Sequence, residues 1–344
     1  MAGIHPLRWL LSPLWAAALA TGAKSFVDNP LIGSKRLNAA GLHAARVRLA
    51  HRMAWWRRAK LAKLIAPEQA EAFARDGFVV VPDFLSAPRF ARLRDGIAAQ
   101  RLPAREMQQG DAITRRIAVD PPVMDVLPEL RALLRDPRWR GLNRYVGSYD
   151  SEPRVYIQTI LAGHYDAPPD PQLHLHADTF HPTVKAWLFL TDVAEDEGPL
   201  TYVAGSHRIT PERLAWEAER SRTVLETGDR LSQRGSLRIE PEELPALGLP
   251  PATRFAVSAN TLVVADTSGF HARGASVRPS TRVEIWAYGR RNPFLPWTGL
   301  DLLSAPLVAH RRGAWYGRAL DRLQRWGLAG QPWRDVGKKF AAER

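Results

Sequence analysis

The chain has 344 residues, 45% of them hydrophobic, and contains no cysteine. This length suits a domain with a sizeable core, and the composition excludes disulfides, thiolate metal sites and a cysteine nucleophile. The net charge of +13 lies at the two ends, because residues 1–64 carry eleven basic residues and one acidic residue, and residues 305–344 carry nine and three. The sequence therefore predicts a basic N-terminal arm (residues 1–65), a central domain (residues 66–304) and a basic helical tail (residues 305–344).

The N-terminal arm combines an apolar run with a basic stretch. The run from residue 9 to residue 20 is shorter than the roughly 20 residues that span a bilayer, so no transmembrane helix is expected. Arg8 and the small residues Ala18-Leu19-Ala20 also fit a secretory signal. Other interpretations are a helical extension that packs on the core and an anchor on an anionic membrane surface. In the anchor, tryptophans lie at the headgroup level and arginines bind phosphates: Trp9, Trp15, Trp55 and Trp56, with Arg46, Arg48, Arg52, Arg57 and Arg58.

The central domain begins with a helix that Pro67 opens and Gly77 ends. A strand over residues 78–81 and a second helix, opened by Pro88, follow. Strand-like apolar runs then recur between turn-rich segments. Several short strands with few helices among them indicate a sandwich or barrel. The expected strands cover residues 155–161, 186–193, 200–203, 261–265 and 283–288, and residues 314–326 of the tail are expected to form a helix.

Two His-x-Asp triplets lie in this region, His164-Tyr165-Asp166 and His176-Ala177-Asp178. In an extended strand, either triplet places an imidazole and a carboxylate on one face. A proline-rich stretch follows His164 and disfavours a regular ladder, whereas His176 follows alternating leucines and precedes a long strand. We therefore select His176 and Asp178, and interpret the first triplet as a loop at the rim of the site or a plain turn.

A second histidine would complete a metal site. Non-haem Fe(II) oxygenases bind their metal with two histidines and one carboxylate on one octahedral face. His271, at the end of the run 261–270, can supply the missing ligand. Arg282 follows eleven residues later, and a guanidinium inside a barrel needs a carboxylate partner. The far carboxylate of a dicarboxylic cosubstrate would serve.

These residues form part of a wider pattern. It includes the opening Ala66-Pro-Glu-Gln-Ala-Glu-Ala-Phe-Ala-Arg-Asp-Gly-Phe-Val-Val-Val-Pro-Asp-Phe-Leu85, the pair Ala186-Trp187 and the hairpin Gly198-Pro-Leu-Thr-Tyr-Val-Ala-Gly-Ser-His207. Over about residues 66–292, the chain resembles the phytanoyl-CoA dioxygenase-like family of Fe(II)/2-oxoglutarate-dependent oxygenases. The resemblance implies a mainly β fold with flanking helices, whose core is a double-stranded β-helix (jelly-roll, cupin-like).

The resemblance also implies roles for individual residues. His176, Asp178 and His271 would bind iron and form the catalytic centre, Arg282 would grip 2-oxoglutarate, and Gln158 and Trp187 would line the cosubstrate pocket. His207 belongs to a hairpin with an architectural role.

The implied reaction is hydroxylation of an unactivated C–H bond in a small or lipid-like substrate, with Fe(II), 2-oxoglutarate and O2, and with ascorbate as a possible accessory. Asp178 argues against halogenation, since halogenating relatives lack the carboxylate. Arg273 is a departure, because the family often has a small hydroxyl residue there. A cytoplasmic location, peripheral on the inner face of the membrane, is expected because iron and 2-oxoglutarate are supplied in the cytosol.

Two other functions stay open on sequence alone. A nucleic-acid- or membrane-binding protein with a catalytically inactive barrel would use the same basic arms. Nucleic acid is not expected as a partner, since the sequence has no aromatic-basic sheet signature. A cupin-like metalloenzyme without a cosubstrate is the other alternative, and Arg282 argues against it.

Overall fold

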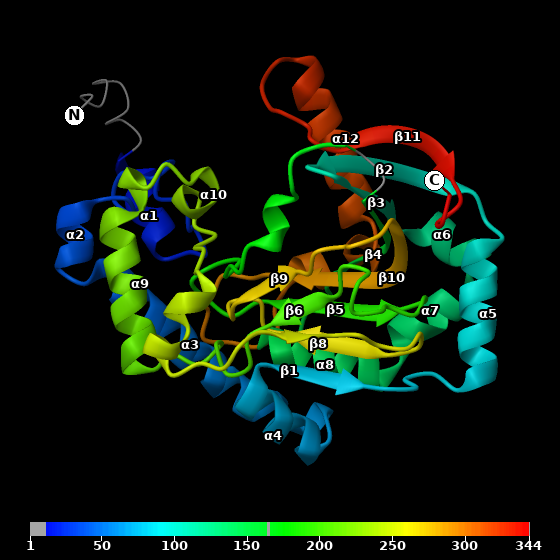
Figure 1. Cartoon of the computed structure of the whole chain (residues 1–344), viewed down its shortest axis with the longest axis horizontal. Coiled ribbons are helices and arrows are strands. Elements are labelled where there is room, and N and C mark those ends of the chain that lie inside the picture. Colours follow the sequence, from blue (N-terminus) through cyan, green and yellow to red (C-terminus); the bar gives the residue numbers. More distant parts are fainter. Residues whose placement is uncertain (1–11, 164–165, 344) are drawn as a thin grey trace.

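Two antiparallel sheets form the centre of the computed structural model, which describes residues 12–163 and 166–343 (Figure 1). The larger sheet has the strand order β1-β8-β5-β10-β4-β3-β2-β11, and the smaller sheet has the order β7-β6-β9. The strands are β1 (Phe78–Val81), β2 (Leu102–Gln109), β3 (Ala112–Ala118), β4 (Arg154–Ala162), β5 (Val184–Phe189), β6 (Leu200–Tyr202), β7 (Thr253–Arg254), β8 (Leu262–Ala265), β9 (His271–Arg273), β10 (Ser280–Gly289) and β11 (Arg334–Lys339). The mainly β, double-stranded β-helix core predicted from the sequence is confirmed.

Alternation along the central strands separates two layers of packing. On β5, Trp187 and Phe189 face a cluster that includes Leu200 and Tyr202 of the smaller sheet. Leu188, between them, belongs to the opposite cluster, where helices cover the sheet. Because side chains alternate with period two, one strand supplies both the cavity wall and the helix-packing face.

Helices flank the sheets, and several begin with proline at the first or second helical position, as expected for a residue that lacks the amide hydrogen. Gly77 ends α4 with a φ of 87°. The helices are α1 (Ser12–Leu19), α2 (Lys35–Ala39), α3 (Leu42–Leu61), α4 (Pro67–Asp76), α5 (Ala87–Ala98), α6 (Pro121–Val126), α7 (Pro128–Arg135), α8 (Pro137–Gly147), α9 (Pro211–Thr223), α10 (Arg230–Gln233), α11 (Pro306–Ala309) and α12 (Arg312–Arg325).

Helix α3 of the N-terminal arm is part of the domain. Arg57 and Arg58 are each 1% exposed, and Arg46 is 6% exposed. Arg57 donates to the carbonyl oxygen of Ser148, and Arg58 donates to that of Val146, at the C-terminal end of α8. Guanidinium groups suit this place because the last carbonyls of a helix lack intrahelical partners and carry partial negative charge.

The buried arginines correct one expectation from the sequence. The prediction that Arg46, Arg57 and Arg58 bind membrane phosphates is wrong, because their guanidinium groups point into the protein and bind its carbonyl oxygens. Arg48 and Arg52 remain exposed on the outer side of α3. Trp9 and Arg8 lie outside the described residues. In the described part of the chain, no helix has both the length and the apolar character needed to cross a membrane.

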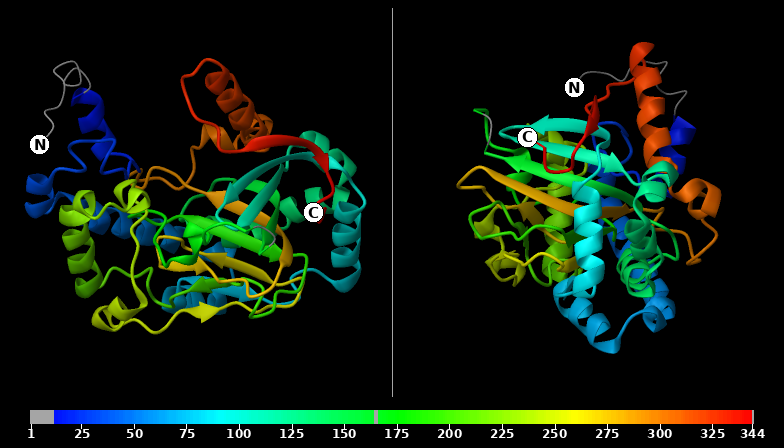
Figure 2. Two further views of the ribbon diagram at one scale, coloured as in Figure 1. Left: turned by 45° about the horizontal axis from the view of Figure 1, so that its top comes forward. Right: turned by 90° about the vertical axis from the view of Figure 1, so that its right-hand side faces the viewer.

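The predicted basic tail also belongs to the fold. Helix α12 stands out from the sheet, and the chain then returns as β11 to pair with β2 (Figures 1 and 2). The register places Arg334 opposite Glu106 and Asp335 opposite Arg105, and opposite charges across strands stabilise such pairing. The helix expected over residues 314–326 corresponds to α12, whereas the strand β11 that follows it was not predicted.

The buried ion pair of α3 gives a stability prediction. Arg58 lies 2.8 Å from Asp266, and both side chains are at most 2% exposed. Arg58→Ala should lower the free energy of unfolding by about 3–5 kcal/mol, because it leaves a buried carboxylate without its cation. Denaturant titration of the full chain measures this, and Arg52→Ala on the exposed side of α3 is the matched control. Equal stability of the two variants would contradict the burial of Arg58.

Candidate metal centre and its cavity

Three of the predicted site residues lie together in the structure. The ligand atoms of His176, Asp178 and His271 all fall within 4.8 Å of one another. His271 is the first residue of β9. His176 lies in the segment before β5 and forms an isolated antiparallel β-bridge with His271. The selection of the second His-x-Asp triplet therefore produces a compact cluster. Of the other triplet, Asp166 is exposed, and His164 and Tyr165 lie outside the described residues.

Backbone hydrogen bonds hold this cluster in place. The amide of His176 donates to the carbonyl of His271, and the amide of His271 donates to the carbonyl of His176, each at 3.0 Å. The amide of Asp178 donates to the carbonyl of Thr267 at 2.8 Å. The two imidazoles consequently lie on one side of the bridge, with ring centroids 4.6 Å apart.

The second nitrogen of each imidazole fixes its orientation. Nδ1 of His176 lies 2.8 Å from the carbonyl oxygen of His174, and Nδ1 of His271 lies 3.0 Å from that of Gly269. A carbonyl only accepts, so each Nδ1 carries the hydrogen and each Nε2 presents a lone pair. Metal-binding histidines commonly have this arrangement. Both Nε2 atoms lie within 4 Å of Oδ1 of Asp178.

The protonation states also suit metal binding. Burial lowers the pKa of His176 to about 3, and burial together with Lys185 lowers the pKa of His271 to about 4. Burial would raise the pKa of Asp178, but Lys185 and the two imidazoles hold it well below its usual range. At neutral pH the cluster therefore offers two neutral imidazoles and one carboxylate, which need lose no proton to bind a metal.

Lys185 is a member of the site that the sequence analysis missed. Its Nζ lies 2.6 Å from Oδ2 of Asp178 and 3.3 Å from Nε2 of His271. A positive group thus already lies among the atoms that would face a metal ion, which shows that the cluster attracts a cation. Because Lys185 precedes Trp187 by two residues on β5, strand alternation could have placed it on the same face.

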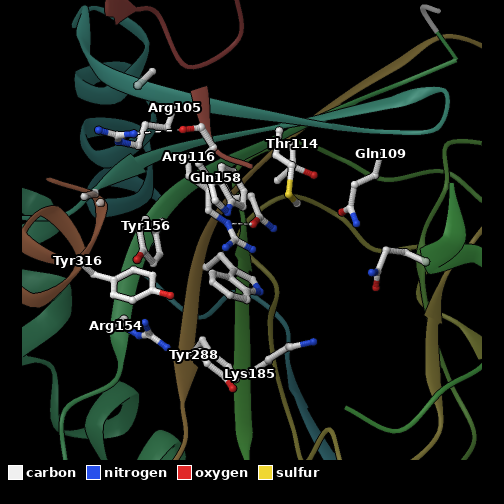
Figure 3. A pocket seen from close by; sticks show the side chains of 18 of the residues that line it. Arg105, Gln109, Thr114, Arg116, Arg154, Tyr156, Gln158, Lys185, Tyr288 and Tyr316 are labelled. Carbon is white, nitrogen blue, oxygen red and sulfur yellow. Dashed lines mark hydrogen bonds between the residues drawn. The ribbon is translucent and has the colours of Figure 1, made fainter. Parts of the chain in front are cut away.

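The cluster lines a cavity of about 720 Å³. Figure 3 shows, on the inner face of the larger sheet, other side chains of this cavity. The predicted ligands line it together with Arg282, Gln158 and Trp187, so the structure brings all six predicted site residues to one cavity. Part of its wall comes from α12 and from residues 331–335. The predicted tail therefore shapes the site.

Arg282 lies in a chain of buried polar groups. Its Nη1 donates to the carbonyl of Gly198 at 2.6 Å, and its Nε lies 3.0 Å from Oε2 of Glu284. Glu284 accepts from Gln158, whose Oε1 accepts from Arg116 at 2.7 Å. The guanidinium keeps Nη donors for a ligand carboxylate, since it has five hydrogens to donate. No motif or spacing in the sequence pointed to Glu284 or Arg116 as residues of the site.

Arg273, the departure from the family pattern, is engaged within the protein. One of its Nη atoms lies 2.5 Å from Asp170, and the other donates to Thr114 at 3.3 Å. Burial lowers the pKa of Arg273. The extra cation beside the site is thus neutralised by a buried carboxylate rather than left free for the cosubstrate.

The loop before His271 is fixed by the N-terminal helix. Asp266, which pairs with Arg58 of α3, also accepts from the amides of Thr183 and Ser268. Asp266 and Thr267 therefore anchor the loop between β8 and β9, and Thr267 in turn accepts from Asp178. Arg58 therefore stabilises the loop that leads to His271 and that binds the amide of Asp178.

Comparison with known proteins agrees with this geometry. The family model of phytanoyl-CoA dioxygenase (PhyH) matches residues 73–241, which include His176 and Asp178, whereas His271 and Arg282 lie beyond that segment. No curated protein matches the chain. Residues 73–241 therefore match the model of the family that the sequence pattern predicted.

Solved structures give more distant similarities. The epimerase SnoN in complex with Fe3+, alpha-ketoglutarate and nogalamycin RO is 20% identical, with a TM-score of 0.44, and the match covers 70% of this chain and 93% of SnoN. HygX from Streptomyces hygroscopicus with nickel and 2-oxoglutarate is 18% identical, with a TM-score of 0.43, covering 71% and 93%. EctD from S. alaskensis with bound Fe is 18% identical, with a TM-score of 0.39, covering 73% and 85%.

Replacing one of the three ligands should cause a specific loss of metal binding. His176→Ala or Asp178→Ala should lower Fe(II) affinity by at least a hundredfold, because each removes one of three ligands. Competition with a metal-sensitive dye under argon measures the affinity. His174→Ala is the matched control, since that imidazole is exposed and lies two residues away. Retention of wild-type affinity by Asp178→Ala would show that the metal binds elsewhere.

Proposed function

We propose that this protein is an Fe(II)- and 2-oxoglutarate-dependent hydroxylase of a small or lipid-like substrate. The observation that carries the proposal is the two-histidine, one-carboxylate cluster, in which each imidazole presents an Nε2 lone pair, in one cavity with Arg282. This ligand set leaves open positions on an octahedral metal ion. Hydroxylation is favoured over halogenation because Asp178 occupies the carboxylate position.

His176, Asp178 and His271 would hold the iron, and Arg282 would hold the far carboxylate of 2-oxoglutarate. When bound, iron and 2-oxoglutarate supply the oxidising chemistry that breaks an unactivated C–H bond, with O2 as the oxidant. The Nδ1 contacts of the two histidines keep their rings oriented during this chemistry.

The protein's own contribution is binding, orientation and exclusion of water. Arg282 would orient the cosubstrate through its Nη donors, and the hydrogen bond to Gly198 ties the guanidinium to the segment before β6. Aromatic side chains of the inner sheet face, including Trp187 and Trp286, form the wall beside it. Such a wall excludes water from the reacting groups and strengthens the electrostatic contacts inside.

The alternatives from the sequence have less support. A metalloenzyme without a cosubstrate would leave the remaining Nη donors of Arg282, which lines the cavity, without a ligand to bind. An inactive barrel that binds nucleic acid through its arms is disfavoured because Arg46, Arg57 and Arg58 are used inside the protein.

Arg282 gives the test of cosubstrate binding. The full chain with Fe(II), O2 and 2-oxoglutarate should form succinate, slowly in the absence of substrate. Arg282→Ala should weaken the binding of 2-oxoglutarate by roughly tenfold or more, because it removes a charge-assisted contact worth about 1.5–3 kcal/mol. Anaerobic titration of the Fe(II)-loaded protein measures this affinity.

Two controls accompany this variant. Arg278→Ala removes an exposed arginine four residues earlier, and Arg282→Ala/Glu284→Gln avoids leaving a buried carboxylate unpaired. Unchanged 2-oxoglutarate affinity in both Arg282 variants would assign the far carboxylate to another cation.

Attachment to an anionic membrane surface is a separate proposal. Its support is a stripe on the outer side of α3, where Arg48, Arg52, Trp56 and Lys60 recur every four residues and are exposed. Lys60 lies over the ring of Trp56, 3.5 Å from its centroid. Spacing of four residues places these side chains on one helix face.

Vesicle sedimentation tests the stripe. The full chain should sediment with vesicles of phosphatidylserine and phosphatidylcholine and be released by salt, since each basic residue near such a surface contributes about 1 kcal/mol. Arg48→Gln/Arg52→Gln/Lys60→Gln should abolish binding. The control Arg92→Gln/Arg94→Gln/Arg131→Gln removes three charges from other exposed positions. Equal loss in both triple variants would assign any binding to net charge.

A further inference from the structure

The cavity carries a large excess of positive charge. Among the described residues, nine basic and three acidic side chains line it. The metal-binding cluster accounts for one of the acids, Asp178. Because this excess surrounds a partly enclosed space, it acts on whatever enters the cavity much more strongly than a charge on an open surface.

Several of these cations have carboxylate partners inside the protein. Arg105 pairs with Asp321, Arg273 pairs with Asp170, and the partners of Arg282 and Lys185 are described above. In the part of the chain that the structure describes, the remaining five lining cations form no ion pair. They are Lys24, Arg116, Arg154, Arg290 and Arg318.

Three of the five gather at the metal end of the cavity. Nζ of Lys24 donates to the carbonyl of Asp178 at 2.5 Å. Tyr288 of β10 is in register with Arg154 of β4 and with Lys185 of β5, so these three side chains form one row across the sheet. Arg290 follows Tyr288 by two residues. The cations therefore surround the space beside the ligand cluster and away from Arg282.

Two of the cations lie close together, because Lys24 and Lys185 both contact Asp178. Positive groups this close destabilise one another in the unliganded protein. An anionic ligand between them would relieve the repulsion.

Aromatic rings share this part of the cavity. The guanidinium of Arg154 lies 5.2 Å from the ring centroid of Tyr288 and 6.0 Å from that of Tyr316, on α12 (Figure 3). Deeper in the cavity, Arg116 lies 4.0 Å from the ring centroid of Trp286. Rings of this kind bury planar or apolar surface, while the guanidinium groups remain available for anions.

We propose that the substrate is an anion: an apolar or aromatic molecule whose carboxylate or phosphate binds Arg154, Arg290 and Lys24 while its body packs on Tyr288 and Tyr316. This inference rests on the proposed function, because it assigns the bound molecule as the substrate of the metal centre. The volume of about 720 Å³ lies within the range of roughly 300–1,000 Å³ typical of small-molecule sites. Two anionic groups are therefore accommodated at opposite ends, with the cosubstrate at Arg282 and the substrate at Arg154.

Binding of three probes of similar shape tests the proposal without turnover. The full chain is titrated calorimetrically with naphthyl phosphate, naphthoate and the neutral naphthylmethanol. The two anions should bind at least tenfold more tightly than the alcohol, because only they make charge-assisted contacts. A larger gain for the phosphate than for the carboxylate would indicate a dianionic substrate group, and the reverse order would indicate a carboxylate.

Variants locate the binding. Arg154→Gln/Arg290→Gln should weaken the anions roughly tenfold or more and leave the alcohol unchanged, while Arg92→Gln/Arg94→Gln removes equal charge from the exposed side of α5. Arg154→Gln alone is the milder variant, since that side chain forms no hydrogen bond with the residues that the structure describes. Equal affinity for alcohol and anions, or equal loss in the control, would overturn the proposal.

A competition experiment separates the substrate end from the cosubstrate end. With Fe(II) and 2-oxoglutarate bound under argon, naphthyl phosphate should bind without displacing 2-oxoglutarate. Displacement would overturn the proposal, because it would make the cation cluster the cosubstrate subsite. If the anions bind as expected but the protein forms no succinate from 2-oxoglutarate, the proposed function fails while the anion site stands.

Discussion

The reciprocal backbone hydrogen bonds between His176 and His271 are the constraint on which the site depends. They join a segment that precedes β5 to the start of β9, and thus bring two imidazoles and Asp178 together from distant parts of the chain. The Nδ1 contacts to backbone carbonyls then orient both rings. Ligand geometry is therefore set by main-chain hydrogen bonds.

Buried arginines extend this constraint into the N-terminal arm. Arg58 of α3 pairs with Asp266, which anchors the loop leading to His271, and Lys24 contacts the backbone of Asp178. The arm thus stabilises the loop that leads to His271, and its Lys24 adds a positive charge to the cavity. The charge excess that the sequence displays at its ends is partly an internal feature, because guanidinium groups satisfy helix-end carbonyls and a buried carboxylate.

The strands with alternating apolar residues and the metal ligands could be predicted from the sequence. Other elements could not, for physical reasons. The triplet His176-Ala177-Asp178 could be selected because His176 follows alternating leucines. Apolar runs predicted the strands β4, β5, β8 and β10. The hairpin β2–β3 was missed because Arg105, Arg115 and Arg116 occupy positions that an ordinary core strand fills with apolar residues. The sequence left the role of α3 open between packing on the core and binding a membrane, because its partners, such as Asp266 and Ser148, are remote in sequence.

The central claim is that one cavity holds iron on His176, Asp178 and His271 and 2-oxoglutarate on Arg282. A crystal structure of the full chain, grown without oxygen with Fe(II) and 2-oxoglutarate and measured at the iron absorption edge, tests it most directly. The account predicts one anomalous peak bonded to both Nε2 atoms and to the Asp178 carboxylate, with the far carboxylate of 2-oxoglutarate on Arg282. An iron peak at other residues, or a cosubstrate held by Arg154 and Arg290, would contradict it.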